Sequence, residues 1–518
     1  MAQTLGAVHP GAFTPFTFIL DQVDPAARVR NALLGGTRLG TDEAGNGLVV
    51  SYSFAGPGST WSAEYDGSVD AANVVTMGNA QRAAIRAALD HIEQFVDVRF
   101  VPVADGAASV GVLRFAQSES AGGAYRFLPH ESPAAGDIWL PWWFGTPEVD
   151  LLPGGSDYMT VLHEIGHALG LTHPHDSSPA MVPGEDWLGG TLMSYRVFPG
   201  DVPASGSWPF VFPDGLSAYD VDALRFLYGA RAHATGDDVY RFEQDPMMLT
   251  TLVDDGGTDL LDLSNQVADV QVDLRQGNWS LVGWEYGWLD PAGNYAELPR
   301  SLRTAFGTII ENANGGSGND HITGNGADNV LAGFDGADML LGLGGNDRLL
   351  GLGGSDQLFG EAGADLLNGG SLADVLDGGA GNDEMFGADG RDRLGGGAGD
   401  DIAHGGSAND ILAGGAGDDV LGGGADDDLL NGGVGDDVLT GGTGRDRFVL
   451  EADAGSSDRI TDFSAGIDQI LLRGGYSVDQ FLAAATTSGG NTSFALANGH
   501  DVLLVGATGV RADWFTTT

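Results

Sequence analysis

Three histidines and a glutamate stand close together near the middle of the N-terminal half of the chain. His163 and His167 are four residues apart, so on a helix they lie on one face and can bind one metal ion. Glu164 directly follows the first histidine and can reach a water molecule on that ion. Gly170 permits the left-handed conformation that ends a helix, and the resulting turn would return His173 as a third ligand. Three neutral imidazoles with one open position suit Zn²⁺.

The segment Leu192-Met193-Ser194-Tyr195 follows the last of these histidines by about twenty residues. Taken alone, Met193 is most simply explained as core packing. Tyr195 has two readings from the residues alone: a phenol beside a zinc site, or a buried tyrosine that makes a hydrogen bond. The alternative for the histidines is a helix that carries them by chance, which their extended spacing disfavours.

Residues 1–235 have the pattern of a mixed α/β region that would position these side chains. Apolar periodicity predicts one helix over 79–96, with Ile85, Leu89, Ile92 and Phe95 on its buried face. A second helix is predicted over 158–171, with Ser156 or Asp157 as its N-cap, and a third over 216–228. Strands are predicted over 48–54, 98–103, 110–115 and 138–144, and then over 239–242, 260–263 and 270–274.

A nine-residue repeat occupies residues 315–449. Glycine recurs every ninth residue from Gly315 to Gly441, which makes fifteen units of the form Gly-Gly-x-Gly-x-Asp-x-apolar-x. The sixth place is Asp in every unit except at Asn329, and the eighth is a large apolar residue except at Ala403. The x-apolar-x piece predicts a short strand whose central side chain points inward, and only stacked units can bury it. Two units per coil are expected.

The aspartates of the repeat provide hard carboxylate oxygens beside backbone carbonyls, which suits Ca²⁺. The block holds 25 Asp and Glu against 5 Arg, so its net charge is 5 − 25 = −20. We therefore expect it to be unfolded without calcium and to fold when calcium bridges adjacent turns. The alternative, a flexible Gly/Asp-rich linker, does not explain the fixed phase. The expected calcium-binding positions in the block are Gly316, Gly318, Asp320, Asp338, Asp347, Asp356, Asp365, Asp374, Asp383, Asp392, Asp401, Asp410, Asp419, Asp428, Asp437 and Asp446.

Composition excludes several classes of protein. The chain has 518 residues and a net charge of −49, which disfavours nucleic acid and anionic membrane surfaces as partners. No apolar run approaches the roughly 18 residues of a membrane span. The first residues have no basic region ahead of an apolar stretch, so a Sec-type signal peptide is not expected. Cysteine is absent, so no disulfide forms.

The histidine and methionine motifs together resemble those of the metzincin metalloproteases, and Pro174 after the third histidine resembles the serralysin branch. The resemblance implies that Met193 packs beneath the metal and that Tyr195 is an additional zinc ligand that can swing away. It also implies that the segment 136–140 is the edge strand along which a substrate lies antiparallel. His175 departs from the family, which tends to have Gly there.

The resemblance extends beyond the motif, over about residues 45–515. Residues 217–229 resemble the helix that closes the serralysin protease domain, and 279–303 read as an insertion. The family's first calcium-binding stretches imply further calcium ligands at Asp254, Gly256, Gly257, Asp259 and Glu311. The final residues, 513–518, resemble an uncleaved type I secretion signal; the alternative is an edge strand that ends the fold.

The expected organisation is multidomain: an α/β metzincin-like zinc protease domain followed by an all-β parallel β-roll. We predict an N-terminal extension that is a candidate propeptide (1–45), the protease domain (46–235), a β-domain (236–314), the fifteen repeats (315–449) and a C-terminal β segment with the secretion signal (450–518).

The sequence predicts a monomeric, secreted zinc endopeptidase that acts on proteins or peptides, with one catalytic Zn²⁺, several structural Ca²⁺ ions, Glu164 as general base and export by a type I apparatus. The first alternative is a calcium-binding RTX surface or matrix protein whose protease-like domain is inactive. The second is an RTX carbohydrate-active enzyme, which has no use for the extended zinc motif.

Overall fold

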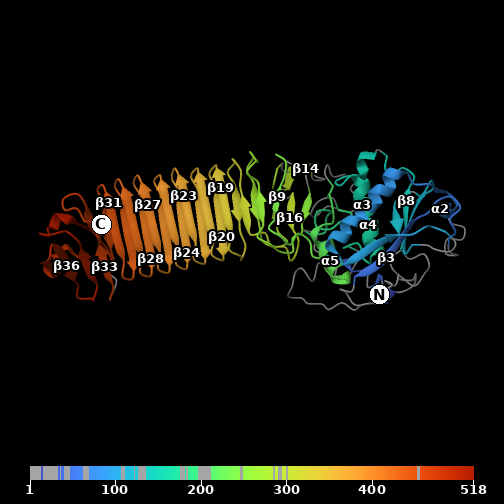
Figure 1. The fold of residues 1–518 in the computed structure, drawn as a ribbon. Coiled ribbons are helices and arrows are strands. Elements are labelled where there is room, and N and C mark those ends of the chain that lie inside the picture. The colour runs from blue at the N-terminus through green and yellow to red at the C-terminus, as the bar shows by residue number, and fades with distance from the viewer. Residues whose placement is uncertain are drawn as a thin grey trace. The chain divides into compact units, whose positions relative to one another are not determined.

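The computed structural model describes two compact units of the chain (Figure 1). The described residues are 13–15, 33–34, 37–39, 47–61, 69–106, 111–121, 123–126, 136–146, 148–175, 181, 185–196, 212–244, 249–283, 286–289, 295–298, 301–451 and 455–517. Unit 1 comprises 1–235, 247–257 and 300–308, and unit 2 comprises 236–246, 258–299 and 309–518. Parts of the segment 236–314 thus belong to each unit.

Unit 1 is built on a mostly parallel sheet. Its strands are β3 (Leu48–Phe54), β4 (Val74–Val75), β5 (Val98–Pro102), β6 (Leu113–Ser118), β7 (Tyr125–Arg126) and β8 (Asp137–Pro141). The main order is β5-β3-β6-β8-β7; β7 runs antiparallel to β8, and β4 pairs antiparallel with β6. The mixed α/β prediction is confirmed.

Several strand boundaries differ from their predictions, and two of the differences have a clear cause. β6 begins at Leu113 rather than at residue 110, because the hydroxyl groups of Ser53 and Ser51 accept the N–H groups of Gly111 and Val112 at 3.1 Å. The predicted strand 138–144 ends at Pro141, because a turn follows in which the Phe144 N–H donates to the Pro141 carbonyl.

The helices of unit 1 pack on this sheet and on each other. They are α2 (Val69–Ala72), α3 (Asn79–Phe95), α4 (Ser156–Ala168) and α5 (Ala218–Tyr228), with the 3-10 turn η2 (Glu148–Leu151). The predicted inward face of α3 is buried, and Ser217 is the N-cap of α5, so both helix predictions are confirmed. The unit also contains the short strands β1 (Phe13–Pro15), β2 (Thr37–Leu39), β10 (Thr250–Leu252) and β16 (Leu302–Thr304). Leu33, Leu34 and Leu39 are buried in the same core, so this part of the N-terminal segment belongs to the folded unit.

Unit 2 is almost entirely β. Before the repeats it contains β9 (Val239–Arg241), β11 (Leu260–Asp262), β12 (Gln271–Asp273), β13 (Trp279–Ser280), the antiparallel pair β14 (Tyr286–Leu289) and β15 (Tyr295–Leu298), and β17 (Asn312–Asn314). The repeats form β18 (His321–Thr323), β19 (Val330–Asp335), β20 (Met339–Gly344), β21 (Arg348–Gly353), β22 (Gln357–Ala362), β23 (Leu366–Ser371), β24 (Val375–Ala380), β25 (Glu384–Asp389), β26 (Arg393–Ala398), β27 (Ile402–Ser407), β28 (Ile411–Ala416), β29 (Val420–Ala425), β30 (Leu429–Val434), β31 (Val438–Thr443) and β32 (Arg447–Leu450).

After the repeats come β33 (Ser457–Ile460), β34 (Gln469–Leu472), α6 (Val478–Ala484), β35 (Ala485–Ser488), β36 (Asn491–Ala495), β37 (Asp501–Leu504), η3 (Ala512–Trp514) and β38 (Phe515–Thr517). β38 pairs parallel with β34, and Trp514 and Phe515 are buried. The last described residues therefore form a strand of the roll. Among the helices of the described ranges, none has the length and apolarity needed to cross a lipid bilayer.

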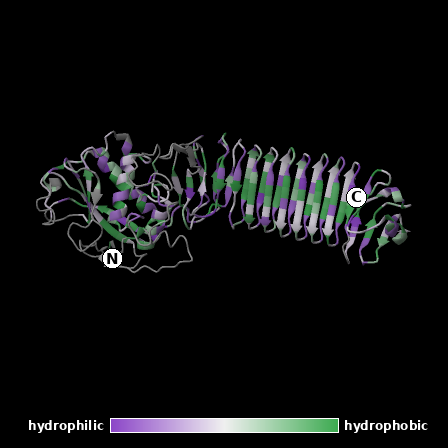
Figure 2. Ribbon diagram, turned by 180° about the vertical axis from the view of Figure 1, so that it is seen from behind, coloured by the Kyte–Doolittle hydropathy of each residue, from purple (hydrophilic) through white to green (hydrophobic). Residues whose placement is uncertain are grey.

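The repeats wind as a parallel roll with two units per coil, as predicted. Alternate strands belong to two sheets, and each strand pairs in parallel with the strand eighteen residues on, for example Leu340 with Leu358. The eighth residue of every unit is buried, from Ile322 through Phe448. Hydrophobic residues recur along successive strands (Figure 2).

The first residue of each unit is glycine because there is no room for a Cβ atom, and not because the backbone is left-handed. Gly351, for example, is not among the residues with positive φ. A Cβ atom built on it would lie 2.4 Å from Oδ2 of Asp356 and 2.5 Å from the carbonyl oxygen of Gly369. Positive φ occurs instead at the second and fourth places of most units, for example at Leu343 and Gly345.

The repeat aspartates form a ladder inside the roll. From Asp338 onward, Oδ1 of each accepts the N–H of the residue eighteen positions earlier, as when Asp356 Oδ1 accepts from Asp338 N at 2.8 Å. Oδ2 of the buried aspartates from Asp338 to Asp428 has no hydrogen-bond partner. Orphaned carboxylate oxygens beside backbone carbonyls are the hard donors that calcium prefers, so the ladder fits Ca²⁺.

Burial, with a smaller effect from neighbouring carboxylates, makes the ionised ladder unfavourable when no cation is bound. It raises the pKa of Asp338, Asp374, Asp419 and Asp428 to about 7.

The two C-terminal ends of the ladder differ from its interior, because protein groups occupy the Oδ2 atoms there. Asp458 Oδ2 lies 2.8 Å from His500 Nε2, and Asp468 Oδ2 accepts from Ser464 N.

We expect the metal-free roll to lose stability as the pH rises. Because the folded-state pKa values lie above the ordinary 3.8, these groups favour folding fully below about pH 4, and this contribution is lost as the pH rises through about 7. With EDTA, far-UV circular dichroism should show more β-structure at about pH 5 than at about pH 8, and millimolar calcium should restore it at the higher pH. Equal β-structure at both pH values without calcium would contradict this.

Two aspartates of one repeat unit provide a matched control. Asp374 is buried on the ladder, whereas Asp377 is exposed on the outer face. Asp374→Asn should therefore weaken calcium-induced folding, and Asp377→Asn should leave the calcium midpoint unchanged.

Candidate metal centre and active site

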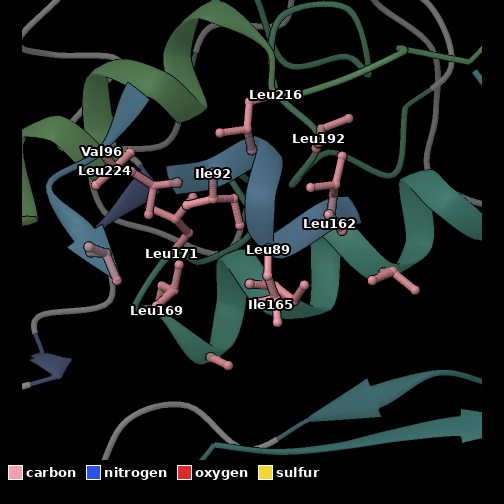
Figure 3. Packing of buried hydrophobic residues seen from close by; sticks show 14 of the residues in the cluster. Leu89, Ile92, Val96, Leu162, Ile165, Leu169, Leu171, Leu192, Leu216 and Leu224 are labelled. Atoms are coloured by element: carbon pink, nitrogen blue, oxygen red, sulfur yellow. The ribbon is translucent and has the colours of Figure 1, made fainter. Parts of the chain in front are cut away.

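Helix α4 carries two of the histidines and is fixed by the core of unit 1. Leu162 and Ile165 of α4 pack with Leu89 and Ile92 of α3 in one buried cluster (Figure 3). The opposite side of α4 is also buried, including His163, Glu164 and His167. The helix is thus covered nearly all round, which holds its polar residues in a fixed frame.

Helix α4 begins earlier than predicted. Its N-cap is Gly155, so the expectation of Ser156 or Asp157 at that place is wrong. The Asp157 carboxylate instead accepts the Gly145 N–H at 2.5 Å, and burial raises the pKa of Asp157. This side chain therefore ties the turn after β8 to the start of α4.

Helix α4 ends at Ala168 rather than at residue 171. Gly170 has a φ of +108°, the Gly170 N–H donates to His167 O, and the Leu171 N–H donates to Gly166 O at 2.9 Å. This is the Schellman arrangement that Gly170 predicts. It reverses the chain directly before His173. The Thr172 N–H then donates to Leu33 O, which fixes the returning segment.

The three histidines converge. Their ligand nitrogens all lie within 4.8 Å of one another, and Nε2 of His167 is 3.0 Å from Nε2 of His173. Nδ1 of His163 lies 2.6 Å from Leu192 O, and Nδ1 of His167 lies 2.8 Å from Leu171 O. Because a carbonyl can only accept, both Nδ1 atoms carry the proton, and each Nε2 presents a lone pair.

This arrangement fits a zinc ion. Tetrahedral Zn²⁺ with Zn–N bonds of 2.0–2.1 Å places its nitrogen ligands about 3.3 Å apart. The one pair at 3.0 Å is close to that value, and the limit of 4.8 Å for the whole set is compatible with it. Neutral imidazoles oriented by carbonyl partners are also the donors and outer partners usual for zinc.

Glu164 and Met193 are both buried at helix α4. Glu164 is buried on α4 beside the histidines. Met193 is 1% exposed, and its Sδ would lie 2.9 Å from a Cβ atom on Gly166. The glycine between the two helical histidines therefore makes room for the methionine against α4.

Tyr195 lies beside the histidine cluster and is not buried. Its ring centroid is 4.3 Å from that of His173 and 5.6 Å from that of His163. With 54% exposure, it does not match the alternative of a buried hydrogen-bonding tyrosine. The side chain can reach a substrate bound at the cluster.

Asp220 is a residue that the sequence reasoning missed. It is fully buried in the first turn of α5, and its carboxylate accepts from Thr191 Oγ1 at 2.5 Å, Leu192 N at 2.8 Å and Ser217 N at 3.1 Å. Burial raises its pKa to about 6. It fixes the turn whose Leu192 carbonyl orients His163. The Ser-x-x-Asp capping pattern at residues 217–220 was the available signal.

The expected substrate edge is corrected. β8, predicted as the edge strand, lies between β6 and β7, and β7 covers it through the pairs Tyr125–Trp139 and Arg126–Ile138. Among the strands that the structure describes, the outermost on this side of the sheet is therefore β7. Its two residues were too few for a periodicity signal.

The calcium positions expected ahead of the repeats are divided between the two units. In unit 1, Asp254 is buried and its Oδ1 accepts the Gly256 N–H at 2.8 Å; Gly256 and Gly257 have φ of +142° and +146°. In unit 2, Asp259 is buried and its N–H donates to Glu311 Oε2 at 2.7 Å.

The first repeat aspartate differs from those that follow. Asp320 Oδ2 accepts the Gly316 N–H at 2.5 Å, and Gly318 passes close to the backbone of Asp269. Asp320 therefore has less carboxylate capacity left for a cation than the later members of the ladder.

Comparison with known proteins identifies two kinds of similarity. Residues 314–455 match the RTX calcium-binding nonapeptide repeat, in overlapping segments 314–349, 341–376, 362–394, 386–421, 395–430 and 422–455. The chain is 30% identical to a serralysin of Proteus mirabilis over 321 residues, which cover 54% of this chain and 60% of that protein.

Two further relatives have similar identity and coverage. Metalloprotease AprA of Pseudomonas entomophila is 29% identical and the alignment covers 48% of this chain and 54% of that protein. Serralysin A of Dickeya chrysanthemi is 31% identical, with 48% and 53% covered. The chain thus spans about half the length of the curated relatives it matches.

We predict that Asp220→Ala destabilises unit 1 and loosens the metal centre. It leaves the buried Leu192 and Ser217 N–H groups without their acceptor, which costs about 2–4 kcal/mol of unfolding free energy. Zinc affinity should fall about 10–100-fold because the Leu192 carbonyl is no longer held. Thermal unfolding and zinc titration measure the two effects.

Asp220→Asn is the matched control. Its amide oxygen can accept both backbone N–H groups while the NH₂ group donates to Thr191 Oγ1, so most stability should remain. Wild-type stability and zinc affinity in Asp220→Ala would show that the carboxylate does not hold the turn.

Proposed function

We propose that this chain, which is related to the serralysin metalloproteases and carries RTX calcium-binding repeats, is a zinc-dependent endopeptidase that hydrolyses peptide bonds in extracellular proteins. The observation that carries the proposal is the convergence of His163, His167 and His173 with two of their Nδ1 atoms held by carbonyls. An inactive domain has no need to keep these nitrogens oriented.

The chemistry that zinc supplies when bound is polarisation of the scissile carbonyl and acidification of a water molecule. Glu164, buried beside the cluster, accepts the proton of the attacking water and passes it to the leaving amine. The Tyr195 hydroxyl donates a hydrogen bond to the oxygen on which negative charge develops. An extended substrate adds to the outer edge of β7.

The roll supports an extracellular location for the proposed enzyme. We propose that the chain leaves the cell through a type I apparatus while the repeats are unfolded, and that extracellular calcium then folds them. The unpaired Oδ2 atoms of the ladder and the repeat match support calcium binding. Roughly millimolar sites would fill only outside the cell. The enzyme is proposed to act as a monomer.

The second candidate is a calcium-binding surface or matrix protein with an inactive protease-like domain, favoured by the length of the repeat block. The two differ in one assay. Digestion of casein that stops when zinc is chelated and returns when zinc is added supports the protease; no digestion by the zinc-loaded, calcium-folded chain supports the matrix protein.

Glu164→Gln should keep zinc and lose turnover. The amide has the same shape as the carboxylate but accepts no proton, so kcat should fall about 10²–10⁴-fold. Cleavage of a fluorogenic peptide gives kcat, and metal analysis gives the zinc content. Proteolysis at the wild-type rate by the zinc-loaded variant would end the general-base assignment.

Tyr195→Phe should lower kcat about 10–10³-fold with little change in KM, because one donor to the developing oxyanion is lost. The variant retains the ring that packs against His173 and loses only the hydroxyl, so a fall in kcat cannot come from lost ring packing. An unchanged kcat would leave Tyr195 with a packing role only.

A further inference from the structure

Asp186 is a buried carboxylate whose contacts surround Tyr195. It is 1% exposed. Its Oδ1 accepts from Ser194 Oγ at 2.6 Å, and its Oδ2 lies 2.8 Å from Arg196 Nε and 3.8 Å from His175 Nδ1. Two of these partners are the residues immediately before and after Tyr195 in the chain.

The third partner touches the tyrosine ring itself. The His175 ring centroid lies 5.6 Å from that of Tyr195 and is stacked at 5.4 Å on His173, with parallel planes. Tyr195 is half exposed, so its ring lacks the close packing that would hold it in a core. Its chain neighbours and the imidazoles beside it are therefore among the groups that hold it in place.

The backbone on both sides of Tyr195 is also linked to Asp186, through the Ser194 hydroxyl. The Arg196 N–H donates to Ser194 Oγ at 3.0 Å, and the Leu188 N–H donates to Arg196 O at 2.9 Å. Because Ser194 Oγ donates to Asp186 and accepts from Arg196 N, this hydroxyl links the carboxylate to both sides of the tyrosine. The charge of Arg196 compensates the buried carboxylate.

We propose that Asp186 is a positioning residue that sets where the Tyr195 hydroxyl lies, with His175 as one of the imidazoles beside the phenol ring. The proposal rests on the proposed function, because Tyr195 is the donor in that mechanism. It assigns to His175, which departs from the family pattern, a role at the site. Asp220 holds the base of the same turn, at Leu192, whereas Asp186 holds its far end.

Asp186→Asn should lower kcat about 10-fold, leave KM within about twofold and leave zinc content unchanged. The adjacent Glu185→Gln is the matched control, since Glu185 accepts from Tyr219 Oη at 2.6 Å and lies 3.6 Å from Arg303 rather than from the neighbours of Tyr195. Equal losses in the two variants, a loss of zinc, or no loss in Asp186→Asn would overturn the proposal.

A double-mutant cycle separates positioning from general stability. If Asp186 acts through the tyrosine hydroxyl, Asp186→Asn should have no further effect on kcat in a Tyr195→Phe background. Losses that multiply would show that Asp186 acts by another route and would overturn the proposal.

A spectroscopic readout is independent of turnover. In protein labelled with 3-fluorotyrosine, the ¹⁹F resonance assigned by Tyr195→Phe should move toward the position of solvent-exposed fluorotyrosine in Asp186→Asn and stay in Glu185→Gln. If Asp186→Asn does not fold, His175→Ala provides the same test, because His175 is partly exposed and its loss removes one of the rings beside Tyr195. An unmoved resonance overturns the proposal. A wild-type protein that cleaves no peptide overturns the proposed function, and the ¹⁹F result still decides the positioning role.

Discussion

Two backbone carbonyls determine which nitrogen the helical histidines present to a metal ion. The Leu192 and Leu171 oxygens hold the protonated Nδ1 atoms of His163 and His167, so the lone pairs of Nε2 point to a common centre. Neither carbonyl belongs to α4; one lies in the turn of Met193 and the other follows Gly170. The helix sets the spacing of the ligands, and the segments that fold back on it set their chemistry.

The stability of the roll is limited by a different factor, the burial of carboxylates of like charge. Its strands need the ladder of aspartates to close each turn, yet burial and neighbouring carboxylates oppose ionisation of those groups. A bound cation removes the conflict, which makes the metal part of the fold rather than an addition to it. Where the ladder ends, at Asp458 and Asp468, a histidine and a backbone N–H occupy the carboxylate oxygens.

Features encoded by spacing could be predicted from the sequence, and features encoded by distant contacts could not. The face shared by His163 and His167 and the two-unit coil of the repeats follow from the periods of helix and strand. The outer strand β7 was missed because two residues carry no period. Asp220 was missed as a support of the site because its partners Thr191 and Leu192 are 29 and 28 residues away in the chain.

The invariant glycine of the repeat illustrates how a correct pattern can have a different cause. Glycine suggests a left-handed backbone, but at Gly351 it is the approach of Asp356 Oδ2 and Gly369 O that excludes a side chain. Positions that do have a left-handed backbone tolerate leucine, as at Leu343 and Leu352 with φ of +79° and +76°. Strain of about 1–2 kcal/mol at such a residue can be offset by the surrounding coil. A carboxylate and a carbonyl cannot move aside without breaking the ladder and the cation site it forms. Steric exclusion, rather than backbone freedom, therefore explains why only this place in the unit never varies.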